Sequence, residues 1–173
     1  MCAKVGRCGA KVASSVSSER STWESRGQVF YTWQYAHGVD AKRRIQLPAK
    51  WRSPQTNAVY SLTLWPHEDW DNACVMVLPH EQWLALVKSL QETKSGDPNA
   101  EVLRRSIGRK SVLVELDKAG RFCLPEEMTK ATEIGSDALL VGMVDRFQIW
   151  SPARFEKVQN SDKAASGPAF RLI

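Results

Sequence analysis

The sequence predicts an α+β fold built from two tandem strand–loop–strand–helix repeats, and three observations predict it. The segment from Asp40 to Pro48 has the same pattern as the segment from Asp117 to Pro125: Asp, three loop positions, Arg, an apolar residue, one further residue, then Leu-Pro. In both halves an apolar strand then leads through a proline to an aromatic residue, Trp83 or Phe155. The spacing is similar throughout, because the motifs lie 77 positions apart and the aromatic residues 72. The chain is therefore interpreted as a tandem duplication.

Each motif is typical of a strand, a tight polar loop and a second strand that ends at a proline. The carboxylates of Asp40 and Asp117 can accept hydrogen bonds from backbone N–H groups two residues later, and Gly120 can adopt a positive φ where the loop reverses. The arginine that follows is expected to point into water. Pro48 and Pro125 lack an N–H for strand pairing and can begin a short helix. A surface hairpin whose charges serve only solubility remains an alternative interpretation.

Periodicity and turn residues predict the other elements of the first repeat. A β-branched and aromatic run predicts the first strand, and a short helical turn is expected after Pro48. Alternation and apolar runs predict two more strands, and an apolar stripe predicts a helix after Pro79. These strands are expected at Val29–Tyr35, Ala58–Leu64, broken by Trp65–Asp69, and Ala73–Leu78; the stripe is Trp83, Leu86, Val87 and Leu90.

The second repeat follows a boundary at Ser95–Asn99, where Gly and Pro interrupt helix propensity. Helices are expected at Ala100–Ile107, after Pro125, and from Ser151 to about Gln159; strands are expected at Ser111–Leu116, Ala138–Val144 and Phe147–Trp150. The domain organisation is therefore a disordered arm (1–27), a first repeat (28–94), a second repeat (95–160) and a flexible tail (161–173).

Composition excludes several classes of protein. The 173 residues are 43% hydrophobic, which suits an ordinary core, and no apolar run reaches the length of a membrane helix. The four cysteines, Cys2, Cys8, Cys74 and Cys123, form no disulfide or zinc pattern, and Cys74 and Cys123 are expected to be buried thiols. A reducing, cytosolic location fits this pattern.

The charge is segregated along the chain, although the net charge is only +5. Five basic residues lie close together against the single acid Asp40, whereas Glu68, Asp69 and Asp71 form an acidic stretch. One basic face of this kind suits a phosphate backbone. The five basic residues are Lys42, Arg43, Arg44, Lys50 and Arg52.

The stretch from His67 to Asp71 has the residue types of a metal or acid/base site, which would make the chain a small metal-dependent hydrolase. Consecutive loop residues point in divergent directions, and no second ligand set occurs at helical spacing. Neither a nucleophile arrangement nor a phosphate-binding glycine loop is found. We therefore expect no catalytic residue, no metal and no cofactor.

The duplicated loop, with Leu140-Val141-Gly142 and the run from Asp145 to Trp150 downstream, resembles the MraZ family of bacterial transcriptional repressors. The resemblance extends from about Tyr31 to about Val158. Two positions depart from the family pattern: Arg43 stands where the first loop normally has Gly, and Gln148 stands where the family has Glu.

The resemblance implies an AbrB-like, swapped-hairpin fold, in which the two halves interleave into one β-barrel-like unit with helices outside. It implies a ring-shaped homo-oligomer that binds G-rich direct repeats in the promoter of its own operon and represses the division and cell-wall gene cluster. Neither enzymatic activity, a small-molecule substrate nor a membrane is implied, and the expected location is the cytoplasm, on the nucleoid. An antitoxin-like interaction protein of the same fold is the alternative.

The resemblance also assigns roles to individual loop residues. Arg44 and Arg121 match the family's loop arginine, so they are expected to contact DNA together with their neighbours Lys42, Arg43 and Lys118. Structural roles in the loops are expected for Asp40, Pro48, Asp117, Gly120 and Pro125.

Overall fold

The computed structural model describes residues 29–55, 57–67, 69–93 and 96–172, without the side chains of residues 67, 69–72, 164 and 172. The predicted N-terminal arm lies outside the described residues. In chain order the strands and helices are β1 (Gln34–Gly38), β2 (Arg44–Gln46), η2 (Ala49–Trp51), β3 (Val59–His67), β4 (Asp69–Pro79), α1 (His80–Glu92), α2 (Pro98–Arg109), β5 (Ser111–Glu115), β6 (Arg121–Cys123), α3 (Glu126–Thr132), β7 (Asp137–Gly142), β8 (Phe147–Trp150), α4 (Pro152–Ala169) and η3 (Phe170–Leu172).

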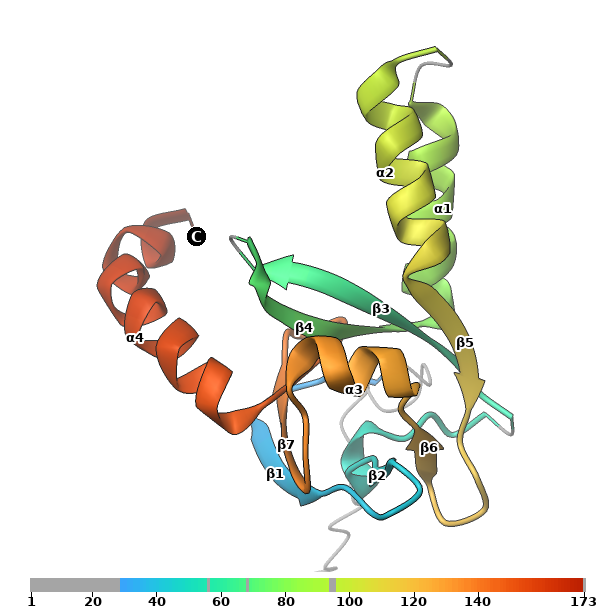
Figure 1. Cartoon of the computed structure of the whole chain (residues 1–173), viewed down its shortest axis with the longest axis vertical. Coiled ribbons are helices and arrows are strands. Elements are labelled where there is room, and N and C mark those ends of the chain that lie inside the picture. The colour runs from blue at the N-terminus through green and yellow to red at the C-terminus, as the bar shows by residue number, and fades with distance from the viewer. Residues whose placement is uncertain (1–28, 56, 68, 94–95, 173) are drawn as a thin grey trace, which may run out of the picture.

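The predicted α+β class is confirmed by a six-stranded antiparallel sheet with helices around it (Figure 1). The strand order is β1-β7-β8-β4-β3-β5, and β2 pairs with β6 in a separate two-stranded ribbon. Because β1 and β5 are the two ends of this order, the described sheet is open, and no closed barrel is found in it. Within the described ranges, no helix combines the length and the apolar character needed to cross a bilayer.

The two halves of the chain exchange strands within the sheet. β1 pairs with β7 of the second half, whereas β5 pairs with β3 of the first half. At the centre, Val75 of β4 pairs with Ile149 of β8, and Val77 pairs with Phe147. In the ribbon Ile45 is opposite Phe122. These two residues occupy the same position in the first and the second motif. This reciprocal register defines an approximate two-fold axis that passes through the centre of the sheet and of the ribbon.

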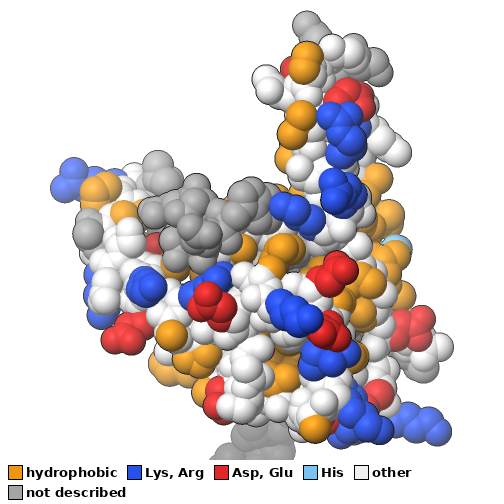
Figure 2. All heavy atoms as spheres, viewed as in Figure 1, with side chains coloured by type: hydrophobic (Ala, Val, Ile, Leu, Met, Phe, Trp, Pro, Cys, Tyr) orange, Lys and Arg blue, Asp and Glu red, His pale blue; other side chains and the backbone are white. Residues whose placement is uncertain are grey.

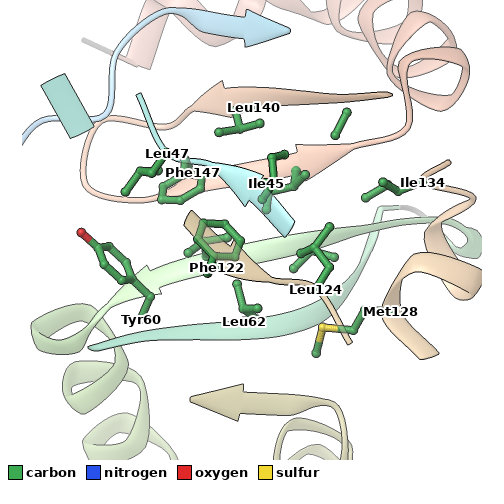
Figure 3. Packing of buried hydrophobic residues seen from close by; sticks show 14 of the residues in the cluster. Ile45, Leu47, Tyr60, Leu62, Phe122, Leu124, Met128, Ile134, Leu140 and Phe147 are labelled. Carbon is green, nitrogen blue, oxygen red and sulfur yellow. The ribbon is translucent and has the colours of Figure 1, made fainter. Parts of the chain in front are cut away.

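The main core lies where the ribbon packs against the sheet. In Figure 3 the side chains of Phe122 and Ile45 lie between Leu140 and Phe147 of one half of the sheet and Leu62 of the other. All five side chains are at most 2% exposed. The apolar positions of β2 and β6 therefore face the sheet, and their neighbours face outward.

A smaller apolar cluster joins α4 to the outer side of the sheet. It contains Cys74, Trp150 and Val158, with Phe155 packed against it. Burial raises the pKa of the Cys74 thiol to about 12, so this cysteine is an inert core residue, as predicted. Cys123 differs from the prediction, because its side chain lies on the outward face of β6 and is exposed.

The helices α1 and α2 form a hairpin that stands away from the sheet (Figure 1). The guanidinium of Arg104 fastens the end of α1, since it donates hydrogen bonds to the backbone oxygens of Leu90 and Thr93. α1 has no fully buried residue, so the apolar stripe predicted for this helix is only partly covered by its neighbours.

Several elements differ from their predicted bounds, and three of the differences have a local cause. Trp33 has a positive φ of 74°, which interrupts the extended run, so β1 begins only at Gln34. β3 continues through Pro66 to His67, because a register shift there accommodates the proline within the hairpin. α4 extends to Ala169 and includes most of the predicted flexible tail, in which three alanines favour a helix.

Candidate nucleic-acid interface

The first loop is closed by the side chain of Asp40. One carboxylate oxygen, Oδ1, accepts hydrogen bonds from the backbone N–H groups of Lys42 and Arg44, both at 2.9 Å. The other oxygen, Oδ2, accepts from Arg44 Nε at 2.7 Å and lies 2.7 Å from Arg44 Nη2. The predicted capping role of Asp40 is thus confirmed, and the same carboxylate also binds the loop arginine.

The second loop repeats this geometry. Asp117 Oδ1 accepts from the N–H groups of Ala119 at 2.9 Å and Arg121 at 3.0 Å. Asp117 Oδ2 lies 2.9 Å from both Nε and Nη2 of Arg121. Two sequences that share only Asp, Arg and the following Leu-Pro therefore fold into the same hairpin.

The residue before each arginine has a left-handed backbone conformation. Gly120 has a φ of 77°, as predicted, and Arg43 has a φ of 58°. For a residue with a Cβ atom this conformation costs roughly 1 kcal/mol, which the surrounding hydrogen bonds offset. The first loop, which carries Arg43, therefore has the same backbone shape as the second loop, which carries Gly120.

Neither Arg44 nor Arg121 points freely into water, which corrects the sequence-based expectation. Each guanidinium folds back onto the aspartate of its own loop, so its side chain is only 34% or 33% exposed. Hydrogen bonds from Arg44 lower the pKa of the Asp40 carboxyl to about 2, and those from Arg121 likewise lower the pKa of Asp117. Both pairs are therefore fully ionised at neutral pH.

The β2–β6 ribbon brings the two loops together at one end of the molecule. The Leu47 N–H donates to the Gly120 oxygen, and the Leu124 N–H donates to the Arg43 oxygen, both at 2.9 Å. Figure 1 shows both loops at the lower end of the view, and Figure 2 shows Lys and Arg side chains gathered there.

The prolines that close the motifs start short helices, as predicted. The carbonyl of Pro48 accepts from the Trp51 N–H in η2, and the carbonyl of Pro125 accepts from the Met128 N–H in α3. Both helices pack beside the ribbon, where Trp51 and Met128 are buried.

Other basic residues in and beside the two loops have different roles. Lys42 and Lys118 are exposed at the loop tips. Arg43 lies 3.9 Å from the carboxylate of Glu126. Arg52 Nε donates to the Leu47 oxygen at 2.9 Å, and its guanidinium occupies the space where a side chain at residue 120 would be. Sequence reasoning missed this role of Arg52. The only signal in the sequence was Gly120, which leaves room for the guanidinium.

The proposed acidic metal cluster between His67 and Asp71 falls on residues whose side chains the structure does not describe. Among the described side chains, no group of three or more His, Cys, Asp or Glu residues could hold a metal ion.

Fold and site together define an α+β protein that presents two Asp–Arg hairpins of like geometry on one ribbon. Comparison with protein families matches residues 109–169 to the family described as "MraZ protein, putative antitoxin-like". The match spans β5, the second loop, β6, α3, β7, β8 and α4.

Individual relatives extend this similarity to most of the chain. A protein of Coxiella burnetii is 29% identical over 121 residues, which are 68% of this chain and 77% of the relative. Proteins of Alcanivorax borkumensis and Thermomicrobium roseum are 27% identical and cover 80% and 79% of this chain. Each is named "Transcriptional regulator MraZ". The resemblance to the MraZ family that the motifs indicated is therefore confirmed.

Proposed function

We propose that this protein is a sequence-specific DNA-binding transcriptional regulator that reads duplex DNA with its two Asp–Arg loops. The observation that carries the proposal is the pair of loops with the same geometry, each holding a charged guanidinium at the same end of the ribbon. The names of the relatives support regulation of transcription rather than catalysis.

The geometry of each arginine suits guanine recognition. A guanidinium has two edges that can make paired hydrogen bonds, and Asp40 occupies the edge formed by Nε and Nη2 of Arg44. The terminal edge, formed by Nη1 and Nη2, can still fork onto O6 and N7 of guanine in the major groove. Because Asp40 holds the side chain in place, less conformational entropy is lost on binding.

The exposed lysines and Arg43 supply the second part of the interface. Lys42 and Lys118 at the loop tips can neutralise phosphates, which fixes the register of the protein on DNA without reading sequence. Arg43 can add a further phosphate contact in the first loop.

The finer assignment follows the family resemblance. The chain would be an AbrB-like, swapped-hairpin repressor of the division and cell-wall gene cluster, binding G-rich direct repeats in the promoter of its own operon from the cytoplasm, on the nucleoid. A ring-shaped homo-oligomer would place several ribbons along repeated sites, so that weak contacts gain avidity. Exposed apolar side chains on the α1–α2 hairpin and on the edge strand β5 support self-association: Leu84, Val102, Leu103, Val112 and Leu113.

Replacement of the loop arginines tests the proposal. We expect Arg44→Ala and Arg121→Ala each to weaken binding roughly ten- to a hundred-fold, because each removes one paired base contact. The probe is a duplex that the wild-type protein selects from a randomised pool, and affinity is measured by fluorescence anisotropy at two salt concentrations. A guanine contact should also reduce the preference for the selected duplex over a scrambled one, whereas a phosphate contact should lower only the salt slope.

The control is Lys163→Ala on the exposed surface of α4, which should bind like the wild type. Unchanged affinity in Arg44→Ala, Arg121→Ala and the double variant would remove these loops as the DNA-reading surface.

An antitoxin-like interaction protein is the second candidate, and the family description and the apolar α1–α2 hairpin favour it. In that case the partner would cover the hairpin. Val102→Ser with Leu103→Ser would then abolish binding of that partner, whereas the arginine variants would still bind it.

A further inference from the structure

Two outward-facing side chains of the ribbon reach across to the loop of the opposite repeat. Gln46 Nε2 of β2 donates a hydrogen bond to the Ala119 oxygen at 3.2 Å. Cys123 Sγ of β6 donates to the Lys42 oxygen at 3.2 Å. Each acceptor is a backbone carbonyl within a loop, two positions before the loop arginine.

These two contacts are equivalent under the approximate two-fold axis. Gln46 and Cys123 occupy the same position of the two motifs, two residues before the proline, and so do Lys42 and Ala119 within the loops. The same crossing occurs in the backbone, where Leu47 and Leu124 donate to Gly120 and Arg43. Each loop is thus held on one side by its own aspartate and on the other side by a strand of the other repeat.

Positions 46 and 123 have no core role that would explain these contacts. Both side chains are exposed, whereas Ile45, Leu47, Phe122 and Leu124 on either side of them are buried. Their polar atoms contact the opposite loop and add nothing to the packing below the ribbon. A change at these positions should therefore affect loop placement more than global stability.

We propose that Gln46 and Cys123 are positioning residues that act in a crossed manner. Gln46 of the first repeat sets the second loop and Arg121, whereas Cys123 of the second repeat sets the first loop and Arg44. The effect on DNA recognition rests on the proposed function, but the crossed restraint of the loops does not.

The two restraints differ in strength because the donors differ. An amide N–H is a strong donor and a thiol is a weak one. The crossed contact that holds the first loop is therefore the weaker of the two.

Amide hydrogen exchange of the DNA-free protein tests the crossed restraint directly. Gln46→Leu should speed exchange at residues 119–121 roughly five-fold, the loss expected for one hydrogen bond, and should leave residues 42–44 unchanged. Cys123→Val should give the opposite pattern. Cys123→Ser and Cys123→Gln retain a donor and should restore slow exchange at residues 42–44. Faster exchange only in the loop of the same repeat as the substituted residue, in both loops or in neither loop would overturn the proposal.

Double-mutant cycles with DNA test the link to recognition. The effect of Gln46→Leu should largely disappear in an Arg121→Ala background and should persist in an Arg44→Ala background; Cys123→Val should do the reverse. Additive effects in all four combinations would overturn the positioning role. If the wild-type protein binds no duplex, the proposed function fails, and the exchange experiment still decides the crossed restraint.

Discussion

At the scale of single residues, a close backbone approach fixes Gly142 more strictly than its burial does. A Cβ atom at Gly142 would clash with the backbone oxygen of Tyr31, in the segment that precedes β1. Gly108, in the exposed α2, has nothing within 4 Å of the equivalent point. The first glycine is required because a neighbouring backbone, which cannot move aside, occupies the space of a side chain.

We therefore expect Gly142→Ala to destabilise the protein by roughly 1–3 kcal/mol, the usual range for overpacking. Gly108→Ala should instead stabilise it by up to about 1 kcal/mol, because alanine favours a helix. Urea denaturation of the two variants measures both effects. Equal stability of the two variants would contradict the close approach of the two segments.

At the scale of elements, the motif loops show which structural features could be predicted from the sequence and which could not. The spacing of Asp, Arg and Leu-Pro predicted the hairpins, the left-handed position at Gly120 and the helices after Pro48 and Pro125, because these depend on neighbouring residues. The return of Arg44 and Arg121 onto their aspartates could not be predicted, since an exposed arginine has many rotamers of similar energy. The exposure of Cys123 depended on which face of β6 the core would cover, and the pairing of β1 with β7 depended on residues far apart in sequence.

The ionised loops are expected to lose stability in acid. The pKa of Asp40 is lowered in the folded state from 3.8 to about 2, and that of Asp117 is lowered in the same direction. The stabilisation is therefore complete above about pH 4 and is lost as the pH falls toward 2. Asp40→Asn with Asp117→Asn should flatten this part of the stability curve, as measured by denaturation midpoints between pH 2 and 6. Asp162→Asn on α4 is the matched control, and an unchanged slope in the double variant would contradict the prediction.

At the scale of the whole molecule, the exchanged strands make the two halves depend on each other. Each half of the sheet contains an edge strand from the other half, and the ribbon takes one strand from each. The main core includes Leu62 and Val77 of the first half and Leu140 and Phe147 of the second. Neither half can complete its core alone.

Fragments 1–95 and 96–173 should therefore fold only when they are mixed. We expect circular dichroism of each fragment alone to lack a cooperative thermal transition, and the equimolar mixture to recover one. A fragment with Phe122→Ala should complement poorly, because a large core side chain is lost, whereas Lys118→Ala at an exposed position should complement normally. A cooperative transition in the isolated first fragment would show that the halves are independent.

The pairing of strands from different halves also affects how the chain folds during its synthesis on the ribosome. Strand β1 is made early, but its partner β7 is complete only when residue 142 has been added. Until then the nascent first half carries unpaired strand edges and an uncovered apolar sheet face, which are the features that promote aggregation during folding. Pairing of β1 with β7 must therefore wait until residue 142 has left the ribosome, and slow translation through the second half should prolong the period in which a chaperone is needed.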